Sequence, residues 1–185
     1  MIIITFLFLY ICSEPCLGGD PYYVVEWSDV IKSCPDFDNT HFNCDDVELG
    51  AAGADDDEGS LSIRGKLVFL EDMEDGVEVD LQISKCTELG DEPMYSVMTD
   101  FCSSLPNTDT PWHPLTVKLN STSCPIPKKE YSLDGLKISL DFATDVMNHE
   151  YCGEYKVRLA MMDNMDMVSC HMLSVAVVEK YHDEE

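Results

Sequence analysis

Basic residues are scarce in this chain of 185 residues: Lys and Arg together number 11, against 36 Asp and Glu, for a formal net charge of -25. A surface this acidic repels the phosphates of nucleic acids and, at neutral pH, the headgroups of anionic membranes. Protonation of carboxylates in an acidic compartment would weaken the second objection. We therefore expect no nucleic-acid partner.

Long apolar runs are also missing, since no stretch reaches the about 18 residues that a membrane-spanning helix needs. Met1–Ile11 is almost wholly apolar and is followed by small residues up to Gly18. This pattern is typical of a secretory signal peptide, although the usual basic residue near the start is absent. A signal anchor is the alternative, and cleavage nearer Ser13 would retain Cys16. We predict a signal peptide over residues 1–18, one domain over residues 19–185, no transmembrane segment, and a secreted or extracellular protein, with the lysosome as a further possible compartment.

The motifs of common catalytic and metal sites do not occur. The sequence has no Gly-x-Ser-x-Gly elbow, no Gly-rich phosphate loop and no His-Glu-x-x-His. No two cysteines have the Cys-x-x-Cys spacing of a zinc site, and the acidic run Asp55–Glu58 lacks the spacing of a calcium loop. His171, beside Cys170 in an apolar run, is better explained as a hydrogen-bonded structural residue. We expect no enzymatic activity, no cofactor and no metal site.

Apolar residues are nevertheless abundant, at 45% of the chain, and in many segments they alternate with polar ones. This period of two is typical of an antiparallel strand with one dry face. The segments that show it are 22–27, 61–70, 77–84, 115–119, 136–140, 154–162 and about 167–178. Turn residues in 71–76 and 163–166 predict hairpins between the strands that flank them. Met94–Leu105 is ambiguous between a strand and a helical turn, and Pro35–Glu58 is predicted to be a long loop.

Six or seven strands separated by turns, with few helical stripes, predict an all-β fold. Dry faces that are strictly one-sided require two sheets that face each other. The predicted fold is therefore a two-sheet, immunoglobulin-like β-sandwich, and neither an internal repeat nor a second domain is visible.

Seven of the nine cysteines remain after cleavage at Gly18, and in a secreted chain this number predicts disulfides. The odd count leaves one thiol free or paired with another chain, unless Cys16 is retained, and spacing does not determine the connectivity or the fate of Cys44. Asn120-Ser121-Thr122 is an N-glycosylation acceptor. Asn120 falls on the polar phase of the predicted strand 115–119, so we expect a glycan there to point outward.

Several short motifs between Phe101 and Val178 resemble those of a known family. They are Phe101-Cys102-x-x-Leu105, Cys124-Pro125, Lys129-x-Tyr131-Ser132-Leu133, Gly153-x-Tyr155-Lys156-Val157, and an apolar strand opened by Cys170. This set resembles the MD-2-related lipid-recognition family, in particular its ganglioside GM2 activator-like members and its secreted insect relatives of chemosensory type. The other short-loop bridges of the activator have no matching cysteines in this chain.

The resemblance implies a non-enzymatic lipid-binding or lipid-transfer protein whose two sheets splay apart around an apolar cavity. The ligand would be an amphipathic lipid such as a glycolipid, or a hydrophobic semiochemical, presented to a glycosidase or a cell-surface receptor. It also implies the disulfides Cys34–Cys170 and Cys102–Cys124, and a third, Cys86–Cys152, if the strands lie as in the family. The expected cavity wall is Ile63, Leu67, Phe69, Val79, Leu81, Ile83, Val117, Ile138, Leu140, Val157, Leu159 and Leu173. Trp112, on a proline-stiffened loop, is the expected mouth residue.

Two other functions fit the same sequence. One is an extracellular interaction or coreceptor module with a filled core, which recognises a protein partner through its acidic loops. The other is an acidic, calcium-dependent matrix protein. A fully interdigitated interior, without a void for a hydrocarbon tail, would favour the first of these over a lipid carrier.

Overall fold

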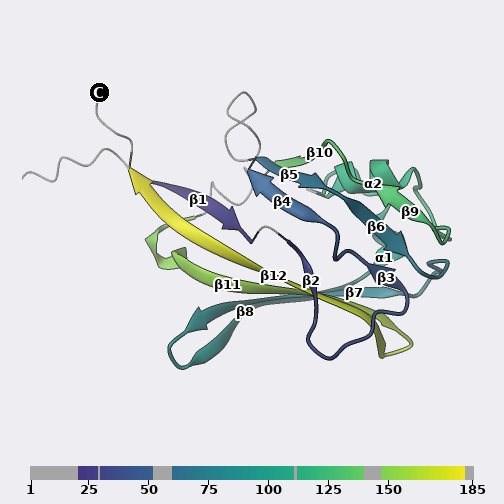
Figure 1. The fold of residues 1–185 in the computed structure, drawn as a ribbon, viewed down its shortest axis with the longest axis horizontal. Helices are drawn as coiled ribbons and strands as arrows, with labels where there is room; N and C mark the ends of the chain where they lie inside the picture. Colours follow the sequence, from purple (N-terminus) through teal and green to yellow (C-terminus); the bar gives the residue numbers. More distant parts are fainter. Residues whose placement is uncertain (1–20, 29, 52–59, 111, 140–146, 182–185) are drawn as a thin grey trace, which may run out of the picture.

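The computed structural model describes residues 21–28, 30–51, 60–110, 112–139 and 147–181, and over these residues the chain is an all-β sandwich (Figure 1). The longer strands are β1 (Pro21–Trp27), β7 (Glu78–Thr87), β8 (Gly90–Asp100), β11 (Gly153–Asp163) and β12 (Asp166–Tyr181). The shorter ones are β2 (Lys32–Ser33), β3 (Phe42–Asn43), β4 (Glu48–Ala51), β5 (Ser60–Arg64), β6 (Lys66–Phe69), β9 (Glu130–Ser132) and β10 (Leu136–Ser139). The helical elements are α1 (Phe101–Ser104), α2 (His113–Leu119) and the 3₁₀ turn η1 (His149–Tyr151). Within the described ranges, no helix has the length and apolarity to cross a membrane.

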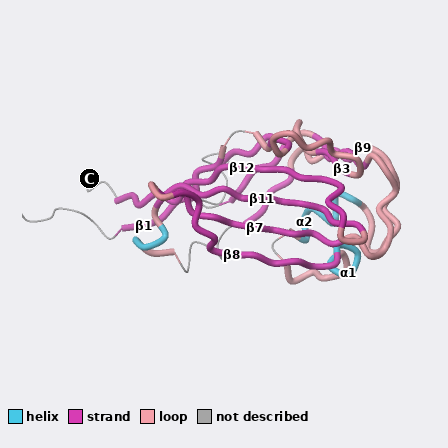
Figure 2. Tube along the Cα trace, turned by 90° about the horizontal axis from the view of Figure 1, so that it is seen from below, coloured by secondary structure: helices cyan, strands magenta, loops and turns pink. Residues whose placement is uncertain are grey.

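One layer of the sandwich is a large antiparallel sheet with the strand order β1-β12-β11-β7-β8, and β2 also pairs with β12. Figure 2 shows β12, β11, β7 and β8 side by side along the molecule. The β11–β12 hairpin, which the sequence predicts, is confirmed. Its turn residues Asn164 and Met165 both have positive φ, 48° and 70°, as a two-residue turn that matches the twist of the strands requires.

The other layer consists of two three-stranded sheets, β10-β5-β4 and β3-β6-β9. The predicted continuous strand 61–70 is wrong in one respect: Gly65 divides it into β5 and β6, which belong to different sheets. Gly65 has φ +104°, and a Cβ there would lie 2.0 Å from the carbonyl oxygen of Asp46, so only glycine fits this close approach. The predicted hairpin between 61–70 and 77–84 is also wrong, because β7 pairs with β8 and β11. The predicted loop 35–58 contains β3 and β4.

The predicted strand 115–119 is a helix, α2, and this is a further correction. Pro114 lies in its first turn, where the missing N–H costs nothing, and Asn120 ends it in the left-handed conformation, with φ 51°. Thr116 and Leu119 are buried, whereas Val117 points to solvent with 62% of its surface exposed. The ambiguous segment 94–105 contains both forms, since β8 runs to Asp100 and α1 follows.

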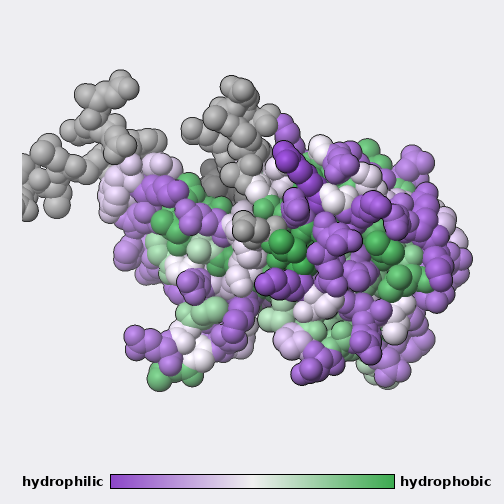
Figure 3. Space-filling model, viewed as in Figure 1, coloured by the Kyte–Doolittle hydropathy of each residue, from purple (hydrophilic) through white to green (hydrophobic). Residues whose placement is uncertain are grey.

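The buried core lies between the two layers at the end of the large sheet near α1 and α2. Phe69, Met73, Leu105, Ile126 and Leu133 are its most deeply buried large side chains. Phe69 makes edge contacts with the rings of Phe42 and Tyr131, at centroid distances of 5.3 and 5.4 Å. At this end of the sandwich, buried side chains from both layers fill the space between the sheets. The outer surface is largely hydrophilic on the side shown in Figure 3, with separate hydrophobic patches, as the net charge leads one to expect.

The two disulfides implied by the family resemblance, Cys34–Cys170 and Cys102–Cys124, are confirmed. The third, Cys86–Cys152, is wrong, because both of these cysteines carry free thiols, as does the buried Cys44. The strands β7 and β11 do pair as expected, but Lys85 lies opposite Tyr155. Continuing this register sets Cys86 beside Glu154, two residues beyond Cys152. Gly153, between Cys152 and Glu154, has φ 138°, so the backbone leaves the extended conformation of the strand before it reaches Cys152.

Candidate hydrophobic ligand site

An apolar strip crosses the large sheet on the side that faces the small sheets. The strand register aligns Leu159 of β11 with Leu81 of β7 and Val97 of β8, and aligns Val157 with Ile83 in the next row. We call these five residues, Leu81, Ile83, Val97, Val157 and Leu159, the apolar face. The alternation of the strands places them together, since every second side chain points to the same side of the sheet.

The second layer covers only part of this side of the sheet. Val77 and Met161, on the same side near the closed end, are each 4% exposed and belong to the core. The five residues of the apolar face are only half-buried. Among the described residues, they belong neither to the core nor to the apolar residues packed against it. Because β7 and β11 have strands on both sides, we infer that their exposed surface belongs to a face that no other described element covers fully. Figure 1 shows the β7–β8 hairpin extending away from the small sheets.

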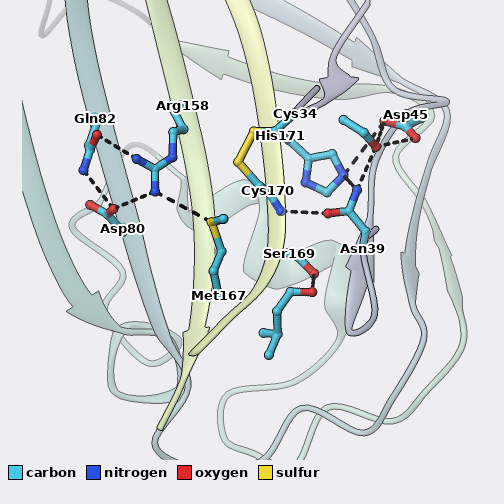
Figure 4. The surroundings of a disulfide bond; sticks show 12 residues. Cys34, Asn39, Asp45, Asp80, Gln82, Arg158, Met167, Ser169, Cys170 and His171 are labelled. Atoms are coloured by element: carbon cyan, nitrogen blue, oxygen red, sulfur yellow. Dashed lines mark hydrogen bonds and ion pairs between the residues drawn. A yellow bond between two sulfur atoms is a disulfide. The ribbon is translucent and has the colours of Figure 1, made fainter. Parts of the chain in front are cut away.

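A partly buried polar network around His171 borders the apolar face (Figure 4). His171 lies on β12 opposite Leu159. Asn39 is fixed in this network because its Oδ1 accepts a 2.7 Å hydrogen bond from the Cys170 N–H, so its Nδ2 must donate. Nδ2 lies 2.7 Å from Ser33 Oγ and 3.2 Å from His171 Nε2. The backbone N–H of Cys44 also donates to His171 Nε2, at 3.3 Å. Nε2 is therefore an acceptor, and the imidazole is neutral.

The surroundings of His171 also favour the neutral ring. Its side chain is 1% exposed, and burial lowers the pKa of His171 below its ordinary value, while the nearby charge of Asp45 partly opposes this shift. Asp45 Oδ1 is 4.0 Å from Nε2, and its carboxylate accepts hydrogen bonds from the Ser33 hydroxyl. His171 therefore places no positive charge beside the apolar face.

Acid should therefore weaken the fold through His171. Because its pKa is lowered in the folded state, the unfolded chain binds more protons once the pH falls below the ordinary histidine pKa of about 6.5. The free energy of unfolding therefore has its full value, as far as His171 is concerned, above about pH 6.5, and it decreases as the pH falls toward the pKa of His171 in the folded state. We expect urea denaturation to give a lower free energy of unfolding at about pH 5 than at about pH 7.5. His171→Gln should flatten this dependence relative to the unmodified chain, and an unchanged dependence would contradict the assignment.

The predicted cavity wall separates into four groups in the structure. Ile63, Leu67 and Phe69 are buried in the closed core, and Ile138 and Leu173 pack against it. Val79, Leu81, Ile83, Val157 and Leu159 are half-buried on the inner side of the large sheet. Val117 is 62% exposed on α2, so it does not line a space between the sheets. Trp112, the predicted mouth residue, is 45% exposed at the start of α2, and its role at a cavity mouth stays a prediction. Leu140 lies outside the described residues.

Sequence reasoning missed Val97, which belongs to the apolar face. The alternation of Tyr95, Val97 and Thr99 on one side of β8 was the available signal. Just before these residues the strand bulges, because Ile83 pairs with Tyr95 but Ser84 pairs with Pro93, which leaves Met94 as an extra residue. A bulge of this kind breaks the period of two on which the strand prediction depends.

A pocket of about 480 Å³ lies elsewhere on the large sheet. Its lining combines polar and apolar residues: Glu26, Trp27, Ser28, Cys86, Glu154, Tyr155, Lys156, Ser174, Val175 and Ala176. Lys156 is paired with Asp91 at 2.7 Å. None of the residues predicted to line a lipid cavity contributes to this pocket.

Comparison of the chain with protein-family models and with curated proteins gave no match.

Proposed function

We propose that the chain is a non-enzymatic binding protein for an amphipathic lipid or another hydrophobic small molecule, held against the apolar face. The observation that carries the proposal is the half-burial of Leu81, Ile83, Val157 and Leu159 on inner strands of a sheet. Side chains of this kind are normally covered by the facing layer of a sandwich. A contiguous apolar surface left open on a soluble protein marks a binding site more often than chance exposure.

The energy available at such a face is sufficient for useful affinity. Each methylene removed from water contributes about 0.8 kcal/mol. An acyl chain of about twelve carbons therefore supplies on the order of 10 kcal/mol before the cost of association. This is compatible with micromolar binding, which corresponds to about 8 kcal/mol. The acidic surface favours a neutral headgroup over an anionic one.

The proposal is tested with the chain secreted from a eukaryotic host. Native mass spectrometry should show a co-purifying hydrophobic molecule. After delipidation, the protein should bind a fluorescent monoacylglycerol analogue more tightly than the matching fatty acid, because only the latter is anionic. Leu159→Asp should weaken binding of the monoacylglycerol analogue by at least about tenfold, since it places a charge beside the acyl chain.

Val117→Asp is the matched control, because it makes a similar aliphatic-to-acid change at an exposed helical position away from the apolar face. Its affinity should equal that of the unmodified chain. Leu81→Gln provides a second, uncharged variant, and thermal melts establish that each protein is folded. Equal affinity of the unmodified, Leu159→Asp and Leu81→Gln proteins would exclude the apolar face as the binding site.

Secretion and glycosylation complete the proposal. The two disulfides are compatible with an oxidising compartment. Asn120 is exposed at the end of α2, where an attached glycan would project into solvent. The family resemblance implies presentation of the ligand to a glycosidase or a cell-surface receptor.

A further inference from the structure

We propose that His149, Cys152 and Glu179 form a binding site for a divalent metal ion of the zinc type, separate from the apolar face. Each residue offers one ligand atom: an imidazole nitrogen, the thiol sulfur and a carboxylate oxygen. These three atoms lie within 4.8 Å of one another. This combination of nitrogen, sulfur and oxygen donors is the set that zinc prefers. The inference goes beyond hydrophobic ligand binding and does not depend on it.

The 3₁₀ turn η1 brings two of the three donors to the same side of the backbone. His149 and Cys152 are three residues apart, and side chains at this spacing are eclipsed in a 3₁₀ helix. The turn is fixed at both ends: Asn148 Oδ1 accepts from the Glu150 N–H at 2.8 Å, and the Cys152 N–H donates to the His149 carbonyl at 3.1 Å. The histidine and the thiol are thus held together by local backbone geometry.

The third donor comes from the far end of β12. Glu179 lies opposite Tyr23 of β1 in the strand register, and its Oε2 is 2.6 Å from His149 Nδ1. Its other oxygen, Oε1, accepts a hydrogen bond from the Tyr181 hydroxyl. A partner of this kind orients a ligating carboxylate, as the outer shell of a metal site commonly does.

Binding of zinc would change the present spacing, in which all three ligand atoms lie within 4.8 Å of one another. With bond lengths of about 2.1 Å to nitrogen and oxygen and about 2.3 Å to sulfur, tetrahedral geometry needs ligand atoms about 3.3–3.6 Å apart. The His149–Glu179 pair would open from 2.6 Å by rotation of the imidazole, whose ring is largely exposed. The fourth coordination position would be left for water. Three protein ligands and one water are an established zinc arrangement.

The other group of possible ligands in the described residues does not compete. It contains Asp75, Cys102 and Cys124, but its two sulfurs are joined in a disulfide and cannot act as thiolates. Cys152 is a half-buried free thiol. Cys86 is also a half-buried free thiol, and it lines the pocket of about 480 Å³ on the large sheet. It therefore serves as a control cysteine of similar exposure.

The test is titration of the full chain with Co²⁺ and then Zn²⁺, under argon and without reductant so that both disulfides stay intact. We expect one equivalent of Co²⁺ to produce a thiolate-to-cobalt charge-transfer band, which Zn²⁺ abolishes by displacement. Cys152→Ser should remove the band, whereas Cys86→Ser should retain it. His149→Ala and Glu179→Gln should each raise the Co²⁺ dissociation constant at least about tenfold.

Circular dichroism of each variant establishes that a lost band reflects a lost ligand and not an unfolded chain. Zn²⁺ should also raise the melting temperature of the unmodified protein, because an ion that binds only the folded state stabilises it by mass action. That increase should be absent in Cys152→Ser. Absence of the charge-transfer band in the unmodified protein, or its loss in Cys86→Ser and persistence in Cys152→Ser, would overturn the assignment.

Discussion

Replacement of Phe69 by alanine should lower the free energy of unfolding by about 3–5 kcal/mol and leave hydrophobic ligand binding by the folded protein unchanged. The ring of Phe69 is 2% exposed and contacts Phe42 and Tyr131 edge-on. Its removal leaves a cavity that these rigid neighbours cannot close, and the residual cavity adds to the lost transfer energy. Urea denaturation followed by circular dichroism measures the change in stability.

Leu159→Ala is the informative comparison, because this residue is half-buried on the apolar face and outside the core. Its truncation should cost roughly 1 kcal/mol in stability, since much of the removed surface was not buried by the fold. It should instead weaken the binding of the monoacylglycerol analogue. Two results would show that the core and the binding face are not separate: a loss of affinity in fully folded Phe69→Ala, or equal losses of stability in the two variants.

The contrast between Phe69 and Leu159 also shows what the sequence could not determine. Both residues alternate with polar neighbours in the same way, so periodicity assigns each to a dry face. Whether a dry face is closed or open depends on how far the opposing layer extends. That extent follows from the pairing of β5 and β6 with partners distant in the chain, which alternation does not specify.

Local signals that were specific did predict local structure correctly. The β11–β12 hairpin follows from two long alternating segments and a polar turn between them. The prediction of a strand over 115–119 was wrong: the segment is helical, and of its three apolar residues Val117 is exposed. Pro114 just before this segment was the available helix-start signal, and Leu115 and Leu119 have the spacing of a helical face.

Disulfide connectivity likewise depends on which strands pair, and the sequence does not specify this pairing. The spacing of the cysteines did not determine their connectivity, and the two bonds that the family resemblance implies are present. The resemblance also led to the pairing of Cys86 with Cys152, which depends on a register exact to one residue. The His149–Cys152–Glu179 group could not be predicted from spacing, because Glu179 joins it only through the position of β12.

Removal of the Cys34–Cys170 disulfide should cause a larger loss of stability than removal of the Cys102–Cys124 disulfide. The bond closes a loop with a sequence separation of 136 residues, and its restriction of the unfolded chain corresponds to about 5 kcal/mol. The double variant Cys34→Ser/Cys170→Ser removes it. The same calculation for Cys102–Cys124, with a separation of 22 residues, gives about 3 kcal/mol. Denaturation of the two double variants under identical conditions compares these values.

The position of the bond gives a second reason for a large effect. Cys170 lies on β12, between β11 and the short strand β2, and its N–H donates to Asn39 of the polar network around His171. Release of Cys34 frees the segment that carries Ser33 and Asn39, so water should reach the imidazole and its pKa should return toward the ordinary value. Cys34→Ser/Cys170→Ser should therefore lose part of the acid sensitivity assigned to His171, which Cys102→Ser/Cys124→Ser should keep. If the first variant is the more stable of the two, or if both retain the same pH dependence, the bond does not hold this network in place.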